Sequence, residues 1–499
     1  MSDRWNSPGA VRFGTLLFPP VGLVLLWRSS EFSIARKIFG TIGIVLFSLI
    51  WSALVVLFLM QFCGLQVEFR GGTIPRLTFC KTVPDYAALE TSRARQRTSS
   101  TPVTGTNSKA SQSAYWNGFR GPRRDGLYDE QPIRTNWPSE GLRPLWRQPI
   151  GGGYASFAIV NGFAFTIEQR RQQEAVVAYD ITTGREIWTN SWEAEFQETL
   201  GGDGPRATPA VADGLVYGLG ALGEFRCIKA ANGEMLWRRN IIDENQAPQL
   251  TYGMAASPVI VEDKVIVAAG GARGKSVVAY DRLSGKVIWT SQDDEAAYSS
   301  PMVMELAGAR QLVAVSDKRA MGMDLNDGKL LWQFPWVVLQ GNRNIAQPLQ
   351  IGTNRIFLSA GYGTGCVAFE INKSGDRFAT RELWRNKNMK NKFSSSVCYQ
   401  GAIYGLDEDI LTCLDAATGA RNWKEGRYGY GQLVLASEQL VILCGDGDLA
   451  IVAAKASRSE ERCRFPAIHG KTWNQPAIGG GFLLVRNALE MACFDVGQR

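Results

Sequence analysis

Side chains that could carry acid–base, metal-binding or nucleophilic chemistry are sparse in this sequence. His469 is the one histidine of 499 residues, which excludes a multi-histidine metal site, and a single histidine is more often a surface or core group than a ligand. Acidic clusters at 293–295, 407–409 and 445–448 could bind a cation, but strand-like runs flank each of them, which favours turns. The glycines at 151–153 lack the lysine and helix of a phosphate-binding loop. With no Ser/His/Asp arrangement in view, the sequence predicts no catalytic residue.

A short repeated pattern organises most of the chain instead. Its best copies run from Ala178 to Trp188 and from Ala279 to Trp289, and both read Ala-x-Asp-x-x-Thr/Ser-Gly-x-x-x-Trp. Each copy fits a hairpin, in which an apolar strand ends at Asp, Gly permits a turn with positive φ, and a second strand carries the Trp. The residues that define the repeat are Trp146, Trp188, Trp237, Trp289, Trp332, Trp384 and Trp423, with Asp180, Gly184, Asp281, Gly285, Asp415 and Gly419.

The spacing of the repeat predicts an all-β, eight-bladed β-propeller. Successive Trp residues lie 42, 49, 52, 43, 52 and 39 residues apart, which is the period of one four-stranded blade. A polar residue, often before Pro, opens a further apolar run in each unit, as in Thr208-Pro209, and eight such inner strands can be counted. A lone Trp146 strand begins the repeats, and the last unit, ending at Gly497, lacks that strand. We expect the two to pair and close the ring, which leaves no sheet edge between them.

This pattern resembles the tryptophan-docking repeat of pyrroloquinoline quinone (PQQ) dehydrogenases and of BamB, the β-barrel assembly lipoprotein. The resemblance covers 143–497, and it implies that each Trp packs between adjacent blades. The segment 116–126 is similar to the lead-in before such propellers in planctomycete-type bacterial proteins. Some copies are degenerate: Lys229 replaces Asp, Asn232 replaces Thr, and the unit ending at Trp384 carries an insertion around 373–380.

The resemblance raises an enzymatic alternative. PQQ dehydrogenases share an Asp base, a carboxylate-rich Ca²⁺ site, a stacking Trp and a pair of adjacent cysteines, and long insertions build their active sites. This chain has no adjacent cysteines, and its units are compact. We therefore expect no cofactor, and PQQ with Ca²⁺ only under the alternative of a divergent PQQ-dependent dehydrogenase.

The sequence before the repeats predicts a membrane anchor (1–64), a juxtamembrane and Ser/Thr-rich stalk (65–113) and then the propeller domain (114–499). Residues 39–62 carry no charge and are long enough to cross a bilayer as a helix. A shorter apolar stretch at 13–27 is interrupted by two prolines, and whether it crosses stays open. Basic residues between 28 and 37 favour the cytoplasmic side, which places the propeller on the exoplasmic or periplasmic side. We expect 91–113, which is poor in apolar side chains, to be flexible.

Charge is uneven along the chain. Residues 1–115 carry 12 Lys+Arg and 5 Asp+Glu, whereas the remaining residues balance at 42 of each. A nucleic-acid-binding domain would show a basic folded face, so nucleic acid is not expected as a partner. The bilayer is the expected partner of 39–62.

Nine cysteines form an odd set without a Cys-x-x-Cys pair. Cys227, Cys413 and Cys493 stand at the Ala position of the repeat, where a small buried residue is required. We expect buried free thiols there. Free thiols are unusual in an oxidising exterior compartment, so they are evidence against the predicted topology.

One set of residues is expected to gather by position. In a propeller, the loops that enter the innermost strands converge on one face around the central channel. The residues just before the inner strands, here named the channel-face ring, are Tyr154, Arg206, Tyr252, Tyr298, Asn344, Lys392, Tyr430 and Trp473. Aromatic and basic side chains suit binding because they combine large contact area with a polar group. The alternative is that they pack between blades.

The favoured hypothesis is a membrane-anchored, non-catalytic propeller that binds a protein or peptide partner at the cell envelope, broadly as BamB does. The divergent dehydrogenase and a glycan-binding module are the alternatives. The sequence does not identify the partner, the membrane or the assembly state.

Overall fold

The computed structural model describes residues 7–63, 65–68, 76–79, 84–98 and 115–498. These residues belong to two compact units, one built from the N-terminal segments up to residue 81 and one from the rest of the chain. The later part of the predicted stalk, 99–113, lies outside the described residues.

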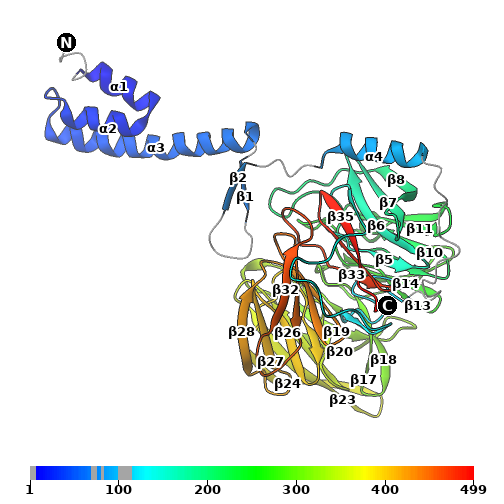
Figure 1. Ribbon diagram of the computed structural model, residues 1–499. Helices are drawn as coiled ribbons and strands as arrows, with labels where there is room; N and C mark the ends of the chain where they lie inside the picture. Colours follow the sequence, from blue (N-terminus) through cyan, green and yellow to red (C-terminus); the bar gives the residue numbers. More distant parts are fainter. Residues whose placement is uncertain (1–6, 64, 69–75, 80–83, 99–114, 499) are drawn as a thin grey trace. The chain divides into compact units, whose positions relative to one another are not determined.

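The described residues of the N-terminal unit form three helices and a short hairpin, which Figure 1 labels. Its elements are α1 (Pro8–Leu17), α2 (Pro19–Arg28), α3 (Ile34–Phe62), β1 (Leu65–Glu68) and β2 (Arg76–Phe79). The two prolines that interrupt the apolar stretch fall at the first positions of α2, where a missing N–H costs nothing. The indole N–H of Trp27 donates to Thr41 Oγ1 at 3.0 Å and Leu26 packs on Gly40, which joins α2 to α3.

Helix α3 is long and apolar enough, by length and composition, to cross a membrane. It contains the whole predicted span 39–62 and begins earlier, at Ile34, because the Ser33 side chain accepts the N–H of Arg36 and caps the helix. Its side chains are largely exposed within the unit.

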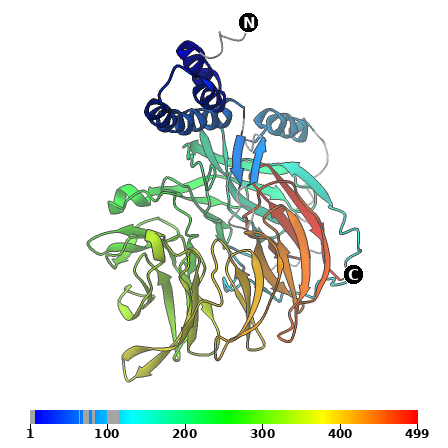
Figure 2. The same cartoon turned by 90° about the vertical axis from the view of Figure 1, so that its left-hand side faces the viewer.

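The second unit is an eight-bladed β-propeller, as predicted (Figures 1 and 2). The first four blades are β5 (Ala158–Val160), β6 (Phe163–Arg170), β7 (Gln173–Asp180), β8 (Glu186–Glu193); β9 (Ala210–Ala212), β10 (Leu215–Leu219), β11 (Glu224–Lys229), β12 (Met235–Asn240); β13 (Val259–Val261), β14 (Lys264–Gly271), β15 (Lys275–Asp281), β16 (Val287–Ser291); and β17 (Met302–Leu306), β18 (Ala309–Val315), β19 (Arg319–Met323), β20 (Leu330–Pro335). The next three are β21 (Leu349–Gln350), β22 (Arg355–Ala360), β23 (Gly365–Ser374), β24 (Arg377–Asn386); β25 (Val397–Tyr399), β26 (Ala402–Asp407), β27 (Ile410–Asp415), β28 (Arg421–Arg427); and β29 (Gln432–Ala436), β30 (Gln439–Leu443), β31 (Asp448–Ala453), β32 (Glu461–Pro466). Short helices α5 (Ile241–Asn245) and η2 (Leu339–Gly341) lie in loops.

The eighth blade closes the ring with strands from both ends of the repeat region. It consists of β33 (Ala477–Gly479), β34 (Phe482–Arg486), β35 (Glu490–Asp495) and the early strand β4 (Trp146–Pro149). Cys493 lies opposite Trp146 in this antiparallel pair. The predicted closure is therefore confirmed. A further strand, β3 (Leu127–Tyr128), adds in parallel to β29.

The repeated Trp residues join each blade to the next. The indole N–H of Trp188 donates to Ala230 O at 2.8 Å, and that of Trp237 donates to Arg282 O at 3.0 Å, in the turn of the following blade. The turn glycine lies against the same ring: Gly285, at φ +67°, contacts Trp237. A small residue faces Trp across the strand pair, as Ala178 faces Trp188, because a larger one would displace the indole.

Trp332 departs from this scheme for a reason that the sequence contains. The insertion at 373–380 extends β23 and β24 into a long hairpin, so the following blade has no short Asp–Gly turn at that place. The Trp332 indole instead donates to Gln311 Oε1 at 2.6 Å within its own blade and packs edge-on against Phe369. The insertion in this degenerate copy of the repeat therefore explains why the Trp332 indole bonds within its own blade and not to the next one.

The prediction of a flexible stalk from residue 91 does not hold for 91–98. These residues form the second half of helix α4 (Tyr86–Thr98), which packs on the first blade and β4 (Figure 1). Leu89 is buried, and the buried Arg93 donates to Gln148 Oε1 at 2.8 Å and Tyr179 Oη at 3.2 Å. The prediction was wrong for 91–98 because it rested on low apolar content. The buried Arg93 holds the helix to the propeller instead, through Glu186 and the Tyr179 ring.

Replacing Arg93 with methionine should release α4 while leaving the blades folded. The guanidinium also pairs with Glu186 at 3.2 Å and lies over the Tyr179 ring at 4.9 Å, so its loss removes the main fastening of the helix. We expect amide exchange across 86–98 to accelerate roughly 30-fold, equivalent to about 2 kcal/mol for lost charged hydrogen bonds. Hydrogen-exchange mass spectrometry measures this directly.

Glu90→Gln is the matched control for Arg93→Met. Glu90 pairs with Arg171 in solvent, with side chains 62% and 59% exposed, and such pairs contribute little. Equal exchange of 86–98 in the two variants would contradict the fastening role of Arg93.

Candidate binding site on the channel face

A belt of hydrogen bonds holds the eight inner strands in register around the channel. One polar residue of each blade takes part: Ser156, Thr208, Ser257, Ser300, Gln347, Ser395, Gln432 and Gln475. Thr208 Oγ1 accepts the Ser156 N–H at 2.9 Å, and Ser257 Oγ accepts the Thr208 N–H at 2.8 Å. Ser156 Oγ donates to Gln475 O at 2.6 Å and closes the belt. The polar residue that opens each inner strand in the sequence is therefore a connector between blades.

The segment 115–128, here named the plug, crosses the channel at the level of the inner strands. Trp116 O accepts the Ile159 N–H at 2.7 Å, and Asn117 O accepts the Val211 N–H at 2.8 Å. Arg120 donates to Ser396 O at 2.8 Å and Gln475 Oε1 at 3.3 Å, and Arg124 reaches two further blades. The lead-in noted in the sequence thus becomes a connection among blades that are far apart along the chain.

Both plug arginines are buried, and the hydrogen-bond acceptors that their guanidinium groups contact are neutral oxygens. Arg124 donates to Ser257 O at 3.0 Å, to Pro301 O at 2.8 Å and to Pro258 O. Burial lowers the pKa of Arg120 to about 10 and that of Arg124 to about 9, so both stay charged at neutral pH. Their positive φ values, 61° and 59°, are held by these contacts. The channel therefore holds two buried positive charges at the level of the inner strands.

Five of the eight ring residues form one continuous cluster. Trp473 lies 5.9 Å from the Tyr154 ring and 6.2 Å from the Tyr430 ring, measured between centroids. The Arg206 guanidinium lies 5.4 Å from the Tyr154 ring centroid, and Lys392 Nζ donates to Tyr430 Oη at 3.0 Å. Burial raises the pKa of Tyr154 well above its usual value and lowers that of Arg206. These five side chains contact one another directly or through a shared neighbour.

The other three ring residues form a second group. The Tyr252 and Tyr298 rings lie 5.8 Å apart, edge to face, and the Tyr298 N–H donates to Asn344 O at 2.9 Å. Asn344 itself is buried, and its amide braces the loop by accepting from the Trp336 indole at 3.0 Å and donating to Ala346 O at 2.7 Å. Asn344 is therefore a structural residue of the ring, whereas the two tyrosines are half-buried at the face.

The sequence argument missed several members of the same surface. Phe393 stacks on Trp473 at 4.6 Å, and Lys471 Nζ lies 3.8 Å from the Trp473 ring centroid. The Tyr362 ring centroid lies 5.2 Å from Lys392 Nζ, and burial together with nearby tyrosines raises the pKa of Tyr362 to about 12. Phe393 and Lys471 adjoin ring positions in the sequence, so a wider window at each loop would have found them; Tyr362 comes from a different loop and carries no such signal.

The other candidates from the sequence have structural roles. His469 is exposed and its Nδ1 lies 3.1 Å from Glu490 Oε1. Asp294 pairs with Arg319 at 2.7 Å, and Asp407 pairs with Lys390 at 2.6 Å and also with Lys424, so these clusters are engaged in ion pairs. Cys227, Cys413 and Cys493 are buried free thiols, as predicted, and burial raises the pKa of Cys227 to about 12.

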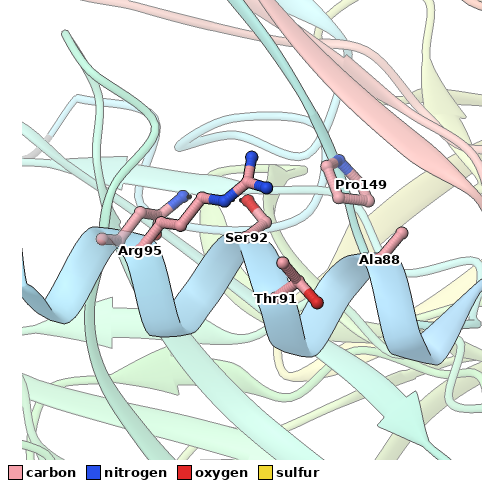
Figure 3. A pocket seen from close by; sticks show the side chains of 6 residues that line it. Ala88, Thr91, Ser92, Arg95 and Pro149 are labelled. Carbon is pink, nitrogen blue, oxygen red and sulfur yellow. Dashed lines mark hydrogen bonds between the residues drawn. The ribbon is translucent and has the colours of Figure 1, made fainter.

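A hollow lies beside α4. It is lined by Ala88, Thr91, Ser92, Arg95, Gln96 and Pro149. Figure 3 shows the helix side chains along one stretch of α4 with Pro149 across from them. The lining carries a single charged side chain and no acid–base pair, so it does not suggest a catalytic centre.

The described residues do not fit the cofactor site of the enzymatic alternative. They contain no group of three or more His, Cys, Asp or Glu side chains placed to hold a metal ion. The ring offers aromatic faces on which a planar group could stack, but the carboxylate set that Ca²⁺ requires is not found among the described side chains. The surface is suited to binding through contact area and positive charge.

Comparison with known proteins gives a family match across the middle of the propeller. A family model whose description is outer membrane protein assembly factor BamB matches residues 172–425, just over half of the chain. The outer membrane protein assembly factor BamB of Bordetella pertussis is 20% identical over 368 residues, which covers 72% of this chain and 85% of that protein.

Solved structures show the same fold. BamB from Moraxella catarrhalis superposes with a TM-score of 0.52 at 14% identity, covering 72% of this chain and 98% of its own. A quinohemoprotein alcohol dehydrogenase from Pseudomonas putida gives a TM-score of 0.56 at 13% identity, covering 78% of this chain and 81% of its own. At these identities the likeness concerns the propeller architecture alone.

Proposed function

The chain belongs to the family of the outer membrane protein assembly factor BamB, and from that premise we propose that it is a membrane-anchored, non-catalytic propeller that binds a protein partner at the cell envelope. The observation that carries the proposal is the channel-face ring, where aromatic and cationic side chains from separate blades contact one another. Tyr154, Lys392 and Trp473 are half-buried there, and Tyr430 is buried. Such side chains supply most of the energy of protein interfaces.

The anchor and the topology are parts of the same proposal. Helix α3 contains the uncharged stretch 39–62, and three basic residues precede that stretch: Arg28 before the helix, and Arg36 and Lys37 in its first turn. Positive charge favours the cytoplasmic side, so the propeller lies outside the membrane that holds α3. The names of the relatives, outer membrane protein assembly factors, support an envelope location.

Cross-linking from the ring tests this proposal. A photoreactive phenylalanine analogue in place of Trp473 should cross-link the full chain, in its native envelope, to a discrete protein partner. The same analogue at Gln400, an exposed turn at the far end of an inner strand, is the control and should give none. We expect at least a tenfold difference in cross-linked product, because binding energy concentrates in a few contacts.

Two results would count against the proposal. Equal cross-linking from Trp473 and Gln400 would mean that the ring is not the binding surface. A saturable thermal stabilisation by PQQ with Ca²⁺, which requires a folded-state site, would favour the divergent dehydrogenase instead.

A further inference from the structure

The positive charge of the channel face indicates which chemical class of partner it binds. Three cations lie at the face, Arg206, Lys392 and Lys471, and the buried Arg120 and Arg124 lie among the inner strands of the channel. The hydrogen bonds described for the three arginines are to neutral oxygens. Positive charges that converge on one face create a field that attracts anions.

The hydrogen bonds and ion pairs of Arg206, Lys392 and Lys471 show how these cations are held at the face. Arg206 donates to Gly202 O at 2.6 Å and to Gly204 O, and Lys471 Nζ donates to Leu200 O at 2.9 Å. Within the described part of the chain, Arg206 forms no ion pair shorter than 4.0 Å, and the ion pair of Lys392 with Glu408 is at the 4.0 Å limit. The negative charges of Glu198 and Asp203 act on Arg206, and Glu408 lies 4.0 Å from Lys392, so neighbouring acids offset part, but not all, of the positive charge of these groups.

Acidic side chains near the face serve the loops that carry it. Glu198 accepts the Gly201 N–H, and Asp203 Oδ1 accepts the Glu198 N–H at 3.2 Å. These carboxylates close the turn before Arg206, so they shape the loop rather than form a direct ion pair with the guanidinium. Farther round the ring, Arg343 pairs with Glu295.

The aromatic rings of Phe393, Tyr430 and Trp473 are the second feature of the face, beside its positive charge. Phe393 and Trp473 are stacked at 4.6 Å with an interplanar angle of 30°, and Phe393 meets Tyr430 edge to face at 5.1 Å. Two lysines contact this group: Lys392 Nζ lies 4.6 Å from the Tyr430 ring centroid and Lys471 Nζ lies 3.8 Å from the Trp473 ring centroid. The Trp473 indole nitrogen is buried and has no hydrogen-bond partner among the described residues, so Trp473 offers the surface its aromatic face and not an accessible donor.

We propose that the surface made by Tyr154, Arg206, Lys392, Phe393, Tyr430, Lys471 and Trp473 binds an acidic segment of the partner protein, with carboxylates at the cations and an aromatic or apolar side chain on the Phe393–Trp473 stack. This inference rests on the proposed function and adds the charge and side-chain type of the segment.

The test uses the full chain in nanodiscs of uncharged lipid and three synthetic peptides. The probe has four Glu-Glu-Phe repeats, and the two references replace every Glu with Gln or with Lys. We expect the acidic peptide to bind at least tenfold more tightly than the Gln peptide, and its affinity to fall with added salt, since the attraction is electrostatic. The Lys peptide should not bind.

Variants locate the binding. Lys392→Gln and Lys471→Gln should each weaken binding of the acidic peptide roughly tenfold, which is the scale of one charge-assisted contact of about 1.4 kcal/mol. Lys286→Gln, an exposed lysine in an outer turn, is the matched control and should change nothing. Trp473→Leu should weaken the acidic and Gln peptides alike, because it removes the aromatic face and leaves the cations.

The outcomes separate this inference from the proposed function. Equal affinity for the acidic and Gln peptides, or no effect of either lysine variant, overturns the acidic-segment inference. If no peptide binds while Trp473 still cross-links a partner in the envelope, the inference is wrong and the proposed function stands. If an oligogalacturonate binds with the same dependence on Lys392 and the acidic peptide does not, the ligand is an acidic glycan and the assignment to a protein segment is overturned.

Discussion

Replacement of Arg124 by methionine is expected to destabilise the propeller by about 3 kcal/mol, since it strands several buried acceptors. Arg124 is 5% exposed, and its guanidinium donates to three carbonyl oxygens at the entrances of two inner strands. Methionine fills most of the volume but donates nothing, so these carbonyls lose their partners in a site closed to bulk water. Chemical denaturation of the full chain in detergent, followed by tryptophan fluorescence, measures the loss.

Arg123→Met is a control one residue away. Arg123 is 47% exposed and pairs with Asp125 at 3.0 Å and Asp129 at 2.9 Å, and an exposed pair contributes no more than about 1 kcal/mol. Similar losses for the two variants would contradict a specific role for the buried guanidinium. Arg124→Lys should not restore stability, because an ammonium cannot span carbonyls on two blades as the planar guanidinium does.

Glu174→Gln is expected to flatten the dependence of stability on pH. Glu174 is fully buried on β7, and burial raises its pKa to about 7 despite the N–H of Ala221, 3.1 Å from Oε1. Between the unfolded pKa near 4.5 and pH 7, the unfolded chain releases this proton while the folded chain keeps it. The contribution of Glu174 to stability is therefore greatest below pH 4.5 and is lost as pH rises through 7, by up to about 3 kcal/mol.

The measurement compares the free energy of unfolding at pH 5 and pH 8. In the Glu174→Gln variant, the neutral amide keeps an acceptor for the Ala221 N–H, so the decline between these two pH values should shrink by about 2–3 kcal/mol. Glu193→Gln, on an exposed position of β8 in the same blade, should leave the decline as it is. An unchanged decline in the Glu174→Gln variant would show that Glu174 is ionised in the folded protein well below pH 7.

The fold could be predicted from the sequence because the information that sets it is local and repeated. Asp180 Oδ1 accepts the N–H groups of Thr182 and Thr183, and Gly184 takes φ +68°, so each hairpin turn is encoded within a few residues. Repetition at the blade period then sets the number of blades, and the spare strand at Trp146 sets the closure. The exception at Trp332 was also encoded, in the insertion that follows it.

The binding surface could be predicted only in part. Tyr154, Tyr430 and Trp473 precede inner strands, so their convergence followed from position in the repeat alone. The stack of Phe393 on Trp473 depends on how far each loop turns back over the channel, which no local pattern specifies. Asn344 occupies a ring position, but its side chain lies within its own loop, where the amide oxygen accepts the indole N–H of Trp336.

The sequence by itself determined the turns, the blade count, the ring closure and the apolar span, since each rests on residue types at fixed spacing. The tertiary structure alone decided which charges meet. Arg120 and Arg124 read as ordinary loop arginines until the ring closes around them and brings the carbonyls of distant blades within hydrogen-bond reach. Arg93 likewise fastens a polar helix only because Glu186 and Tyr179 lie opposite it on the propeller. Contacts between residues hundreds of positions apart form only when the fold brings those residues together. A sequence pattern can predict such contacts only where the pattern repeats from blade to blade.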